Sequence, residues 1–318
     1  MAKKYIETER IRLSSGRQIP VLGLGTCAPL QSEEEIIEAV KSALRSGYRH
    51  IDCAAIYRNE RAVGHALKEA FVMGIVKRED LFITSKLWNT CHKPELVLPS
   101  LKKTLDDLGL EYLDLYLMHW PMAYKEGGEM NPLDENGKAI SSDVDYIDTW
   151  QAMEDCRDMG KTRDIGLSSF NSQQIQRLLD SARIPPVAIQ LEVNCYNTNK
   201  KLVEFAKSKG LVVVAFSPLG TPSKGAEFQL LQEPVIQEIA DSHKKTPAQV
   251  AIRYLIQQGL ATVPKSVTAR RIAENTEVFD FKLTDEEISK LETLNRNYKV
   301  YSEKIAVNHK YYPFNADF

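Results

Sequence analysis

Short apolar runs alternate with amphipathic helical patterns along almost the whole chain, and this alternation constrains the fold more than any other feature. Eight strand–helix units can be counted, beginning at the apolar run Val21–Gly25. The most apolar run, Leu211–Phe216, has no polar face. Strands that are apolar on both faces are typical of parallel sheets, and eight regular units fit a closed barrel better than an open sheet. The sequence therefore predicts an α/β chain folded as a (β/α)8 TIM barrel.

The predicted boundaries follow the change from apolar run to helical period. Strands are expected at Val21–Gly25, Tyr48–Asp52, Leu81–Lys86, Leu113–His119, Thr162–Ser168, Val187–Glu192, Leu211–Phe216 and Ala261–Pro264. The helices that follow them are expected at Ser32–Ser46, Glu60–Phe71, Glu95–Leu108, Tyr146–Met159, Ser172–Ser181, Lys200–Lys209, Thr246–Gln258 and Ala269–Val278. Ser32 with Glu35, and Thr246 with Gln249, have the spacing of capping boxes, which supports two of the helix starts.

Three kinds of segment fall outside the repeat. The stretches Arg10–Leu13 and Gln18–Val21 flank a Ser-Ser-Gly turn and predict an N-terminal β-hairpin. Two helices are expected beyond the eight, one of them near Pro234–Ser242. The polar stretch Trp120–Asp145 is too long for an ordinary strand-to-helix loop, and the tail from Asn295 onward is rich in tyrosine. Long loops on a barrel usually form pocket walls, so we expect both at the C-terminal face.

Charge and cysteine content argue against several classes of function. The net charge is −2 and the pI is about 6.4, whereas nucleic-acid surfaces and polybasic membrane anchors need concentrated Lys and Arg. The five cysteines are odd in number and lack Cys-x-x-Cys spacing, so neither a zinc site nor a disulfide framework is expected. No signal-peptide core or membrane-spanning run is recognisable, which favours a cytoplasmic protein. No Pro/Ser-rich linker divides the chain, so residues 1–318 are expected to form one domain.

Polar side chains end three consecutive predicted strands: Asp52, Lys86 and His119. Tyr57 follows in the loop after the first of these strands. Taken singly, such an aspartate is often a helix cap, such a lysine is usually on the surface, and such a histidine often packs in a core. Because the C-terminal ends of barrel strands face one cavity, the four together favour a catalytic site.

The chemistry of these four groups fits proton donation to a carbonyl oxygen. Tyrosine is a weak acid, with a pKa of about 10. A nearby Lys86 cation is expected to lower the pKa of Tyr57 by stabilising the phenolate. Asp52 could hold that lysine charged and oriented, while His119 could donate a hydrogen bond to a carbonyl oxygen as negative charge develops there.

At these residues the chain resembles the aldo-keto reductase family. The segments HIDCAAIYRNE, ITSKLW and LYLMHWP surround Asp52 with Tyr57, Lys86 and His119. The resemblance continues in IGLSSFN, IQLEVNCY, VVAFSPLG and VPKSVTARRIAEN, in order, and spans nearly the whole chain. It is closest to the aldose and aldehyde reductase branch, whose members are monomeric NADPH-dependent carbonyl reductases. That branch includes arthropod ecdysteroid ketone reductases, which makes 3-dehydroecdysone one candidate substrate.

The resemblance implies a role for each matching residue and no metal. The catalytic group is Asp52, Tyr57, Lys86 and His119. The NADPH contacts fall on Thr26, Asp52, Ser168, Ser169, Gln190, Phe216, Ser217, Leu219, Lys265, Ser266, Thr268, Arg271, Glu274 and Asn275. The substrate contacts include Cys27, Ile56, Tyr57, Trp88, His119 and Trp120. A pocket of this kind, apolar and with little fixed charge, suits aldehydes and hydrophobic ketones, including steroids.

The cofactor expectation also has support independent of the family. Lys265 ends the last strand just before a helix, and Arg271 lies within that helix. Loops after the last strands of a barrel commonly hold phosphate groups, and three anion donors there, Lys265, Ser266 and Arg271, favour NADPH over NADH.

The chain departs from the family pattern at four places. Cys27 stands where these reductases often have tryptophan, which predicts a roomier and less aromatic pocket floor. Ser169 replaces the usual asparagine beside the nicotinamide amide, and Phe216 replaces the usual tyrosine, which keeps the stacking area but loses a hydroxyl. The loop after Gly220 is expected to be somewhat short.

Three other interpretations compete with this one. Gly23–Ala28 fits GxGxxA, a weak signal for a Rossmann dinucleotide site, although the cap at Ser32 separates it from the next helix. A barrel aldolase could use Lys86 as a Schiff-base amine, but a neighbouring Asp52 would keep that lysine charged and poorly nucleophilic. Finally, some family members are channel-associated subunits or lens structural proteins, so cofactor binding with little turnover is an alternative function.

Overall fold

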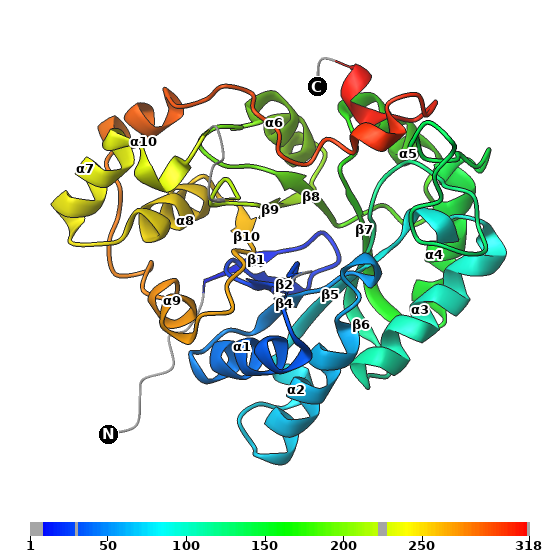
Figure 1. Ribbon diagram of the computed structural model, residues 1–318, viewed down its shortest axis with the longest axis horizontal. Coiled ribbons are helices and arrows are strands. Elements are labelled where there is room, and N and C mark those ends of the chain that lie inside the picture. Colours follow the sequence, from blue (N-terminus) through cyan, green and yellow to red (C-terminus); the bar gives the residue numbers. More distant parts are fainter. Residues whose placement is uncertain (1–8, 29–30, 222–227, 317–318) are drawn as a thin grey trace.

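Eight parallel strands form a closed barrel in the computed structural model, which describes residues 9–28, 31–221 and 228–316. They follow one another in chain order across the sheet, β3 to β10 (Figure 1). The strands are β3 (Leu24–Gly25), β4 (His50–Asp52), β5 (Phe82–Leu87), β6 (Leu113–Met118), β7 (Thr162–Ser168), β8 (Ala188–Glu192), β9 (Val212–Phe216) and β10 (Ala261–Thr262). Parallel bridges from Leu22 to Thr262 and from Gly25 to Lys265 join the first strand to the last and close the ring. The predicted fold class is confirmed.

The helices form a ring outside the strands (Figure 1). Those of the repeat are α1 (Glu33–Arg45), α2 (Glu60–Val72), α3 (Pro94–Leu108), α4 (Tyr146–Asp158), α5 (Ser172–Ser181), α6 (Lys200–Ser208), α8 (Pro247–Gln257) and α9 (Ala269–Glu274). The two extra helices are α7 (Pro234–His243) and α10 (Asp285–Glu292). Both predicted capping boxes are present, Ser32 with Glu35 and Thr246 with Gln249.

The last helix of the repeat is shorter than predicted, because it ends at Glu274 and not at Val278. Side chains of α8 bind carbonyl groups at and after this end. The amide of Gln249 donates to the Glu274 carbonyl, and Arg253 donates to the Val278 carbonyl. Free carbonyl groups at a helix end need such partners, so contacts with a neighbouring helix decide where α9 stops.

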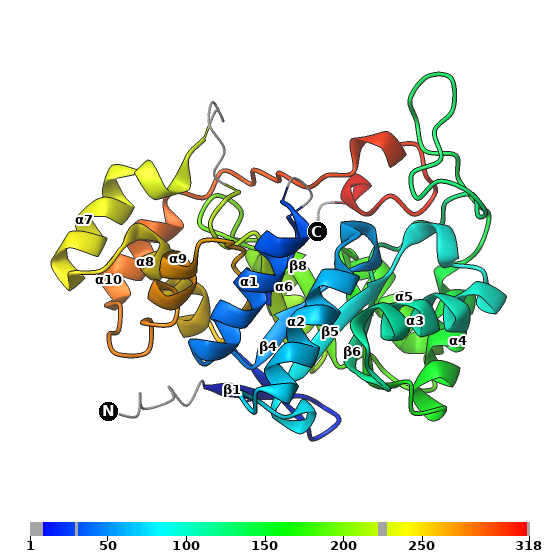
Figure 2. The same cartoon turned by 60° about the horizontal axis from the view of Figure 1, so that its bottom comes forward.

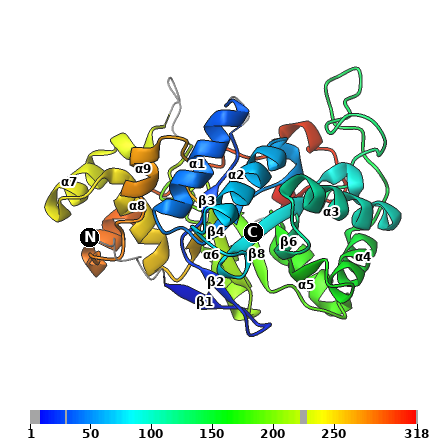
Figure 3. The same cartoon turned by 90° about the horizontal axis from the view of Figure 1, so that it is seen from below.

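The two ends of the barrel carry different segments. The hairpin of β1 (Arg10–Arg12) and β2 (Gln18–Pro20) lies at the N-terminal ends of the strands, where Ser15 donates to Asp164 near the start of β7. The opposite end carries the 120–145 loop and the C-terminal tail, which crosses the barrel mouth (Figure 2). Seen from the side, the hairpin and these long segments lie at opposite ends (Figure 3). The tail and loop are therefore placed to wall a site at the C-terminal ends of the strands.

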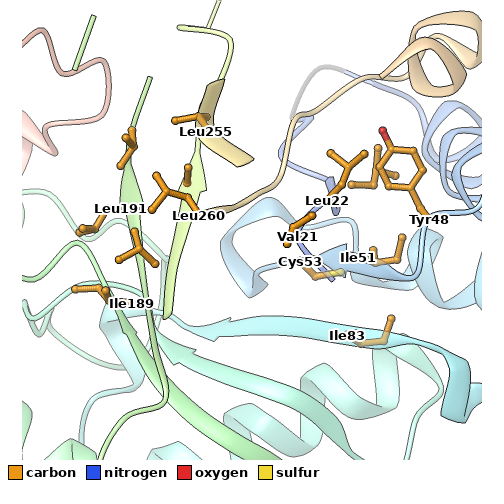
Figure 4. Packing of buried hydrophobic residues seen from close by; sticks show 14 of the residues in the cluster. Val21, Leu22, Tyr48, Ile51, Cys53, Ile83, Ile189, Leu191, Leu255 and Leu260 are labelled. Atoms are coloured by element: carbon orange, nitrogen blue, oxygen red, sulfur yellow. The ribbon is translucent and has the colours of Figure 1, made fainter. Parts of the chain in front are cut away.

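Both faces of the strands are buried. In β6, Leu115 and Leu117 pack in the cluster inside the barrel, whereas Tyr116 and Met118 pack in the larger cluster under the helices. Figure 4 shows part of the outer cluster, which includes Ile189 and Leu191 of β8 together with Leu255 of α8 and Leu260. This two-sided burial explains why the strand sequences are apolar without alternation.

Gly23 and Gly25 lie where the first strand of the barrel meets the last. A Cβ atom on Gly25 would lie 2.7 Å from the Val263 carbonyl oxygen, and one on Gly23 would lie 2.6 Å from Nδ1 of His50. Only glycine allows the backbones to approach this closely. The Rossmann interpretation of Gly23–Ala28 is thus wrong, because the glycines close a barrel and do not open a helix.

The described residues include no helix long and apolar enough to cross a membrane. All five cysteines are free thiols. In the part of the chain that the structure describes, no three His, Cys, Asp or Glu side chains group as they would to hold a metal ion.

Candidate active site at the barrel mouth

A buried ion pair lies at the centre of the predicted site. Nζ of Lys86 at the end of β5 is 2.6 Å from Oδ1 of Asp52 at the end of β4, and both residues are buried. The lysine also donates to the Cys53 carbonyl at 2.8 Å. The second carboxylate oxygen of Asp52 accepts from the Gln190 amide at 2.7 Å. These contacts hold the lysine in one position. The sequence predicted the pairing of Lys86 with Asp52, but not the contact of Lys86 with the Cys53 carbonyl or that of Gln190 with Asp52.

Tyr57 lies directly against this pair. A single 3-10 turn, Ala55–Tyr57, carries it out of β4, and Arg58 in the left-handed region ends the turn. The tyrosine hydroxyl is 3.3 Å from Nζ of Lys86. The expected direction of its pKa was wrong: burial and then the negative charge of Asp52 raise the pKa of Tyr57 well above its usual value. Tyr57 therefore keeps its proton at neutral pH, which is the form a proton donor needs.

His119 follows β6 and faces Tyr57 edge to face, with ring centroids 6.1 Å apart. Burial, and then the Lys86 cation, lower the pKa of His119 well below its usual value, so the ring is neutral. Its Nδ1 is buried and has no hydrogen-bond partner among the described residues. Trp88 also packs edge to face with His119, with ring centroids 5.2 Å apart. A neutral, half-buried imidazole beside a tyrosine hydroxyl can orient a carbonyl oxygen without adding charge.

The predicted nicotinamide contacts meet at the ends of three neighbouring strands. Ser168, Ser169 and Gln190 are buried there, and the backbone N–H of Ser169 donates to the Gln190 carbonyl at 3.0 Å. Ser169 has a φ of 60°, a conformation that asparagine tolerates better than serine. Phe216 ends β9 with its ring partly exposed at the same mouth. These hydroxyl and amide groups can pair with a carboxamide, and the Phe216 ring can stack on a flat heterocycle.

Exposed cations follow β10. Lys265 is exposed, and its ammonium has one weak contact, 3.5 Å to the Gln31 side chain. Arg271 on α9 is exposed and pairs with no carboxylate within the described ranges. The other predicted phosphate and adenine contacts lie around these two: Ser266, Thr268, Glu274 and the buried Asn275. Two cations without carboxylate partners suit a phosphate group.

The remaining predicted cofactor contacts, Thr26, Ser217 and Leu219, make contacts within the protein near the barrel mouth. Thr26 donates its hydroxyl to the Asp52 carbonyl at 2.9 Å and so ties β3 to β4. Ser217 has a φ of 52° and shares a 2.5 Å hydroxyl contact with Thr221. Leu219 packs partly buried against the core. The loop after Gly220, predicted to be short, includes residues 222–227, which lie outside the described residues.

Comparison with known proteins decides the family. The Aldo/keto reductase family profile matches residues 21–296. This chain belongs to the aldo/keto reductase family. It is 44% identical over 318 residues to prostaglandin-E(2) 9-reductase of Oryctolagus cuniculus, covering 98% of each chain. It is 46% identical to aldo-keto reductase family 1 member A1 of Gallus gallus, covering 96% of this chain and 97% of that one.

A solved structure supports the same assignment. The aldose reductase from Schistosoma japonicum superposes with a TM-score of 0.93 at 47% identity, covering 98% of this chain and all of that one. Membership at this level makes the chain an enzyme of the family, an oxidoreductase whose relatives reduce carbonyl groups.

Aromatic side chains wall the reductase site on the side of the long loop. Trp88, Trp120, Met122, Tyr124 and Ala306 form one buried cluster, against which Ile56 packs. The Trp88 indole donates to the Met130 carbonyl at 2.6 Å, and Trp120 meets Phe314 of the tail edge to face. The structure therefore brings the predicted wall residues, the 120–145 loop and the tail together. Cys27 is half-buried near Lys86, and burial raises the pKa of its thiol.

Glu192 holds the tail over the mouth, a role that the sequence analysis missed. This buried carboxylate, at the end of β8, accepts the backbone N–H groups of Val300 and Tyr301 at 2.9 and 3.0 Å. Tyr301 then packs edge to face on Phe216, with centroids 5.7 Å apart. A cavity lies between this tail and the strand ends, lined in part by Ser169, Glu192, Phe216 and Tyr301. The signal was present in the sequence, since Glu192 is the one charged residue of this strand and stands at its C-terminal end.

Glu60, the first residue of α2, is expected to make the free energy of unfolding depend on pH. Its buried carboxyl accepts from Ser85 at 2.5 Å and Thr104 at 3.0 Å. Burial raises its pKa to about 7, above the unfolded value of about 4.3. Between these pH values the unfolded chain releases a proton that the folded chain keeps, so the free energy of unfolding falls as pH rises.

We expect Glu60→Gln to remove this dependence. Relative to the wild type, the free energy of unfolding of the variant should be unchanged below about pH 4 and higher by about 4 kcal/mol above about pH 7. Urea unfolding at several pH values measures the difference. A constant difference across the whole range would contradict the assignment of this proton to Glu60.

Proposed function

We propose that this reductase converts aldehydes and ketones to alcohols, with Tyr57 as the proton donor. NADPH, when bound, supplies the hydride. The observation that carries the proposal is the position of the Lys86 ammonium, fixed between Asp52 and the Cys53 carbonyl and 3.3 Å from the Tyr57 hydroxyl. This is the arrangement that a tyrosine needs to lose a proton only as charge develops on a substrate.

Each residue has a separate task. Tyr57 is protonated in the resting site and gives its proton to the carbonyl oxygen as that oxygen becomes an alkoxide. Lys86 stabilises the phenolate that remains, because its cation is already in place and desolvated. Asp52 holds Lys86, and Gln190 holds Asp52. His119 orients the carbonyl oxygen as a neutral group.

The cofactor is proposed from the residues that could hold it. The buried groups of Ser168, Ser169 and Gln190 suit the nicotinamide amide, and the partly exposed Phe216 ring offers a stacking surface. Lys265 and Arg271 favour a cofactor with an extra phosphate, NADPH in place of NADH. The further contacts are Thr26, Ser217, Leu219, Ser266, Thr268, Glu274 and Asn275. We also propose that residues 1–318 act as one domain and as a cytoplasmic monomer.

The aldolase alternative is weaker on this geometry. Nζ of Lys86 donates to the Asp52 carboxylate, the Cys53 carbonyl and the Tyr57 hydroxyl, and these three donations use all the hydrogens of an ammonium group, which has no lone pair for attack on a substrate. Borohydride trapping tests this directly, since a covalent adduct on Lys86 would support the aldolase and contradict the reductase mechanism.

The test of the proposal is oxidation of NADPH in the presence of 4-nitrobenzaldehyde, followed by absorbance. We expect turnover with NADPH to exceed turnover with NADH. A panel of short aldehydes, sugars and ketosteroids, with 3-dehydroecdysone among them, then ranks the substrates. Tight NADPH binding without any turnover would contradict the proposal and favour the structural or subunit role.

A further inference from the structure

The tail places a carboxylate in the aromatic wall of the site. The hydroxyl of Tyr124 donates to Oε1 of Glu303 at 2.9 Å. The Tyr124 ring meets Trp88 edge to face at 6.2 Å, and Trp88 meets His119 at 5.2 Å. Two aromatic contacts thus connect Glu303 with the group proposed to orient the carbonyl. The sequence predicted an apolar pocket with little fixed charge, and Glu303 adds an ionisable carboxyl group to the aromatic wall on this side.

Nothing described near Glu303 neutralises its charge. Glu303 is half-buried, and Tyr124, which donates to it, belongs to the aromatic wall cluster. No cation within the described ranges pairs with it, and its second oxygen, Oε2, has no hydrogen-bond partner there. Burial accordingly raises the pKa of Glu303. A carboxylate in such surroundings is expensive to keep unless something binds it.

Anchoring of the tail does not account for this residue. Glu192 already binds two backbone N–H groups of the tail, and both of its oxygens are used. Asn171 donates to the Pro313 carbonyl and Gln174 to the Tyr311 carbonyl farther along. The N–H of Ala139 donates to the Ile305 carbonyl and joins the long loop to the tail. Glu303, by contrast, leaves one oxygen open, and its backbone has a φ of 46°, which is unfavourable for glutamate.

We propose that Glu303 forms a polar subsite of the substrate pocket, which favours carbonyl compounds that carry a positively charged group and disfavours those that carry a carboxylate. This inference rests on the proposed carbonyl reduction and names a substrate class for it. The open oxygen accepts a hydrogen bond from the charged group, while the Tyr124 hydroxyl keeps the carboxylate in place. Because Glu303 is half-buried beside aromatic side chains, such a pairing discriminates more strongly than it would at a fully exposed position.

The experiment compares benzaldehydes that differ in the charge of the para substituent. The cationic probe carries a trimethylammonium group, the anionic probe a carboxylate, and the neutral probe a nitro group. Each charge is also tested at the end of a three-carbon ether, which extends the reach. The quantity measured is the ratio of kcat/KM for cationic and anionic probes of equal length, so intrinsic differences in aldehyde reactivity cancel between variants.

The decisive variant is Glu303→Gln, because glutamine can still accept the Tyr124 hydrogen bond. We expect its cation-to-anion ratio to fall by about tenfold or more at one of the two lengths. Tyr124→Phe keeps the carboxylate, so its ratio should stay well above that of Glu303→Gln. Glu135→Gln removes the same charge from an exposed position of the long loop and should leave the ratio unchanged.

The possible outcomes separate this inference from the proposed function. Absence of turnover with the neutral probe in the wild-type enzyme would overturn the proposed function, and the subsite with it. Turnover with an equal ratio in wild type and Glu303→Gln at both lengths would overturn the subsite alone. An equal loss for all three probes in Glu303→Gln would also overturn it, since that result marks a structural role. A fall of the ratio in Glu135→Gln as large as in Glu303→Gln would overturn the subsite as well, since it would attribute the preference to the net charge of the protein.

Discussion

Replacement of Tyr57 by phenylalanine is expected to lower kcat for 4-nitrobenzaldehyde by about three orders of magnitude. The variant keeps the ring beside His119 and loses only the hydroxyl that lies 3.3 Å from Lys86. No other described hydroxyl contacts that ammonium group, so no substitute proton donor is in place. The dissociation constant for NADPH should change by about twofold at most, since the proposed cofactor contacts lie elsewhere. Steady-state kinetics and fluorescence titration measure the two quantities.

A control variant shows whether the loss of activity is specific to the Tyr57 hydroxyl. Tyr298→Phe removes a hydroxyl from an exposed tail residue that packs on Phe228, away from Lys86. It should behave like the wild type in both measurements. Retention of about a tenth of the wild-type kcat in Tyr57→Phe would refute its role as the proton donor, because donation by a positioned group contributes about 100-fold or more.

The second large effect concerns stability and is expected from Lys86→Met. The lysine is fully buried, so its loss leaves the Asp52 carboxylate with Gln190 as its remaining side-chain partner. An unpaired charge in such a place costs about 3–5 kcal/mol. We therefore expect the free energy of unfolding, measured by urea denaturation at neutral pH, to fall by that amount. Reductase activity should be lost as well.

The double variant Asp52→Asn/Lys86→Met tests the cause. With both charges gone, no ion remains unpaired, and asparagine can still accept from Gln190. The double variant should therefore be more stable than Lys86→Met, although it lacks one more native group. A double variant as unstable as the sum of the two single changes would show that lost packing, and not an unpaired charge, explains the effect.

Site residues were predictable where they sit at strand ends. The period of the apolar runs places the ends of β4 and β5, so Asp52 and Lys86 could be assigned to one rim before any contact was known. Tyr57 is one of thirteen tyrosines, and what singled it out was its place just after Asp52, with Lys86 and His119 at the next two strand ends. The direction of its pKa shift was wrong because the sequence names its neighbours but not the depth of its burial.

Residues that act across long separations were not predictable. Gln190 reaches Asp52 over 138 positions, and Tyr124 reaches Glu303 over 179. Helix α10 shows a different limit: its Thr284 and Glu287 capping box was readable in the sequence but followed the last expected repeat. The length of α9 depended on side chains of α8, which no local pattern encodes.

The alternation of apolar runs and helical periods by itself determined the barrel, because local hydrogen bonding and two-sided burial leave parallel strands with covering helices as the consistent arrangement. It also placed Asp52 and Lys86 at strand ends on one rim of the barrel. Only the tertiary structure decided the character of the pocket. The long loop and the tail have no hydrophobic period that fixes their path. Their contacts place Glu303 beside an aromatic wall that the sequence had predicted to be apolar. Charge and burial there depend on neighbours far apart in the chain, which no local pattern brings together.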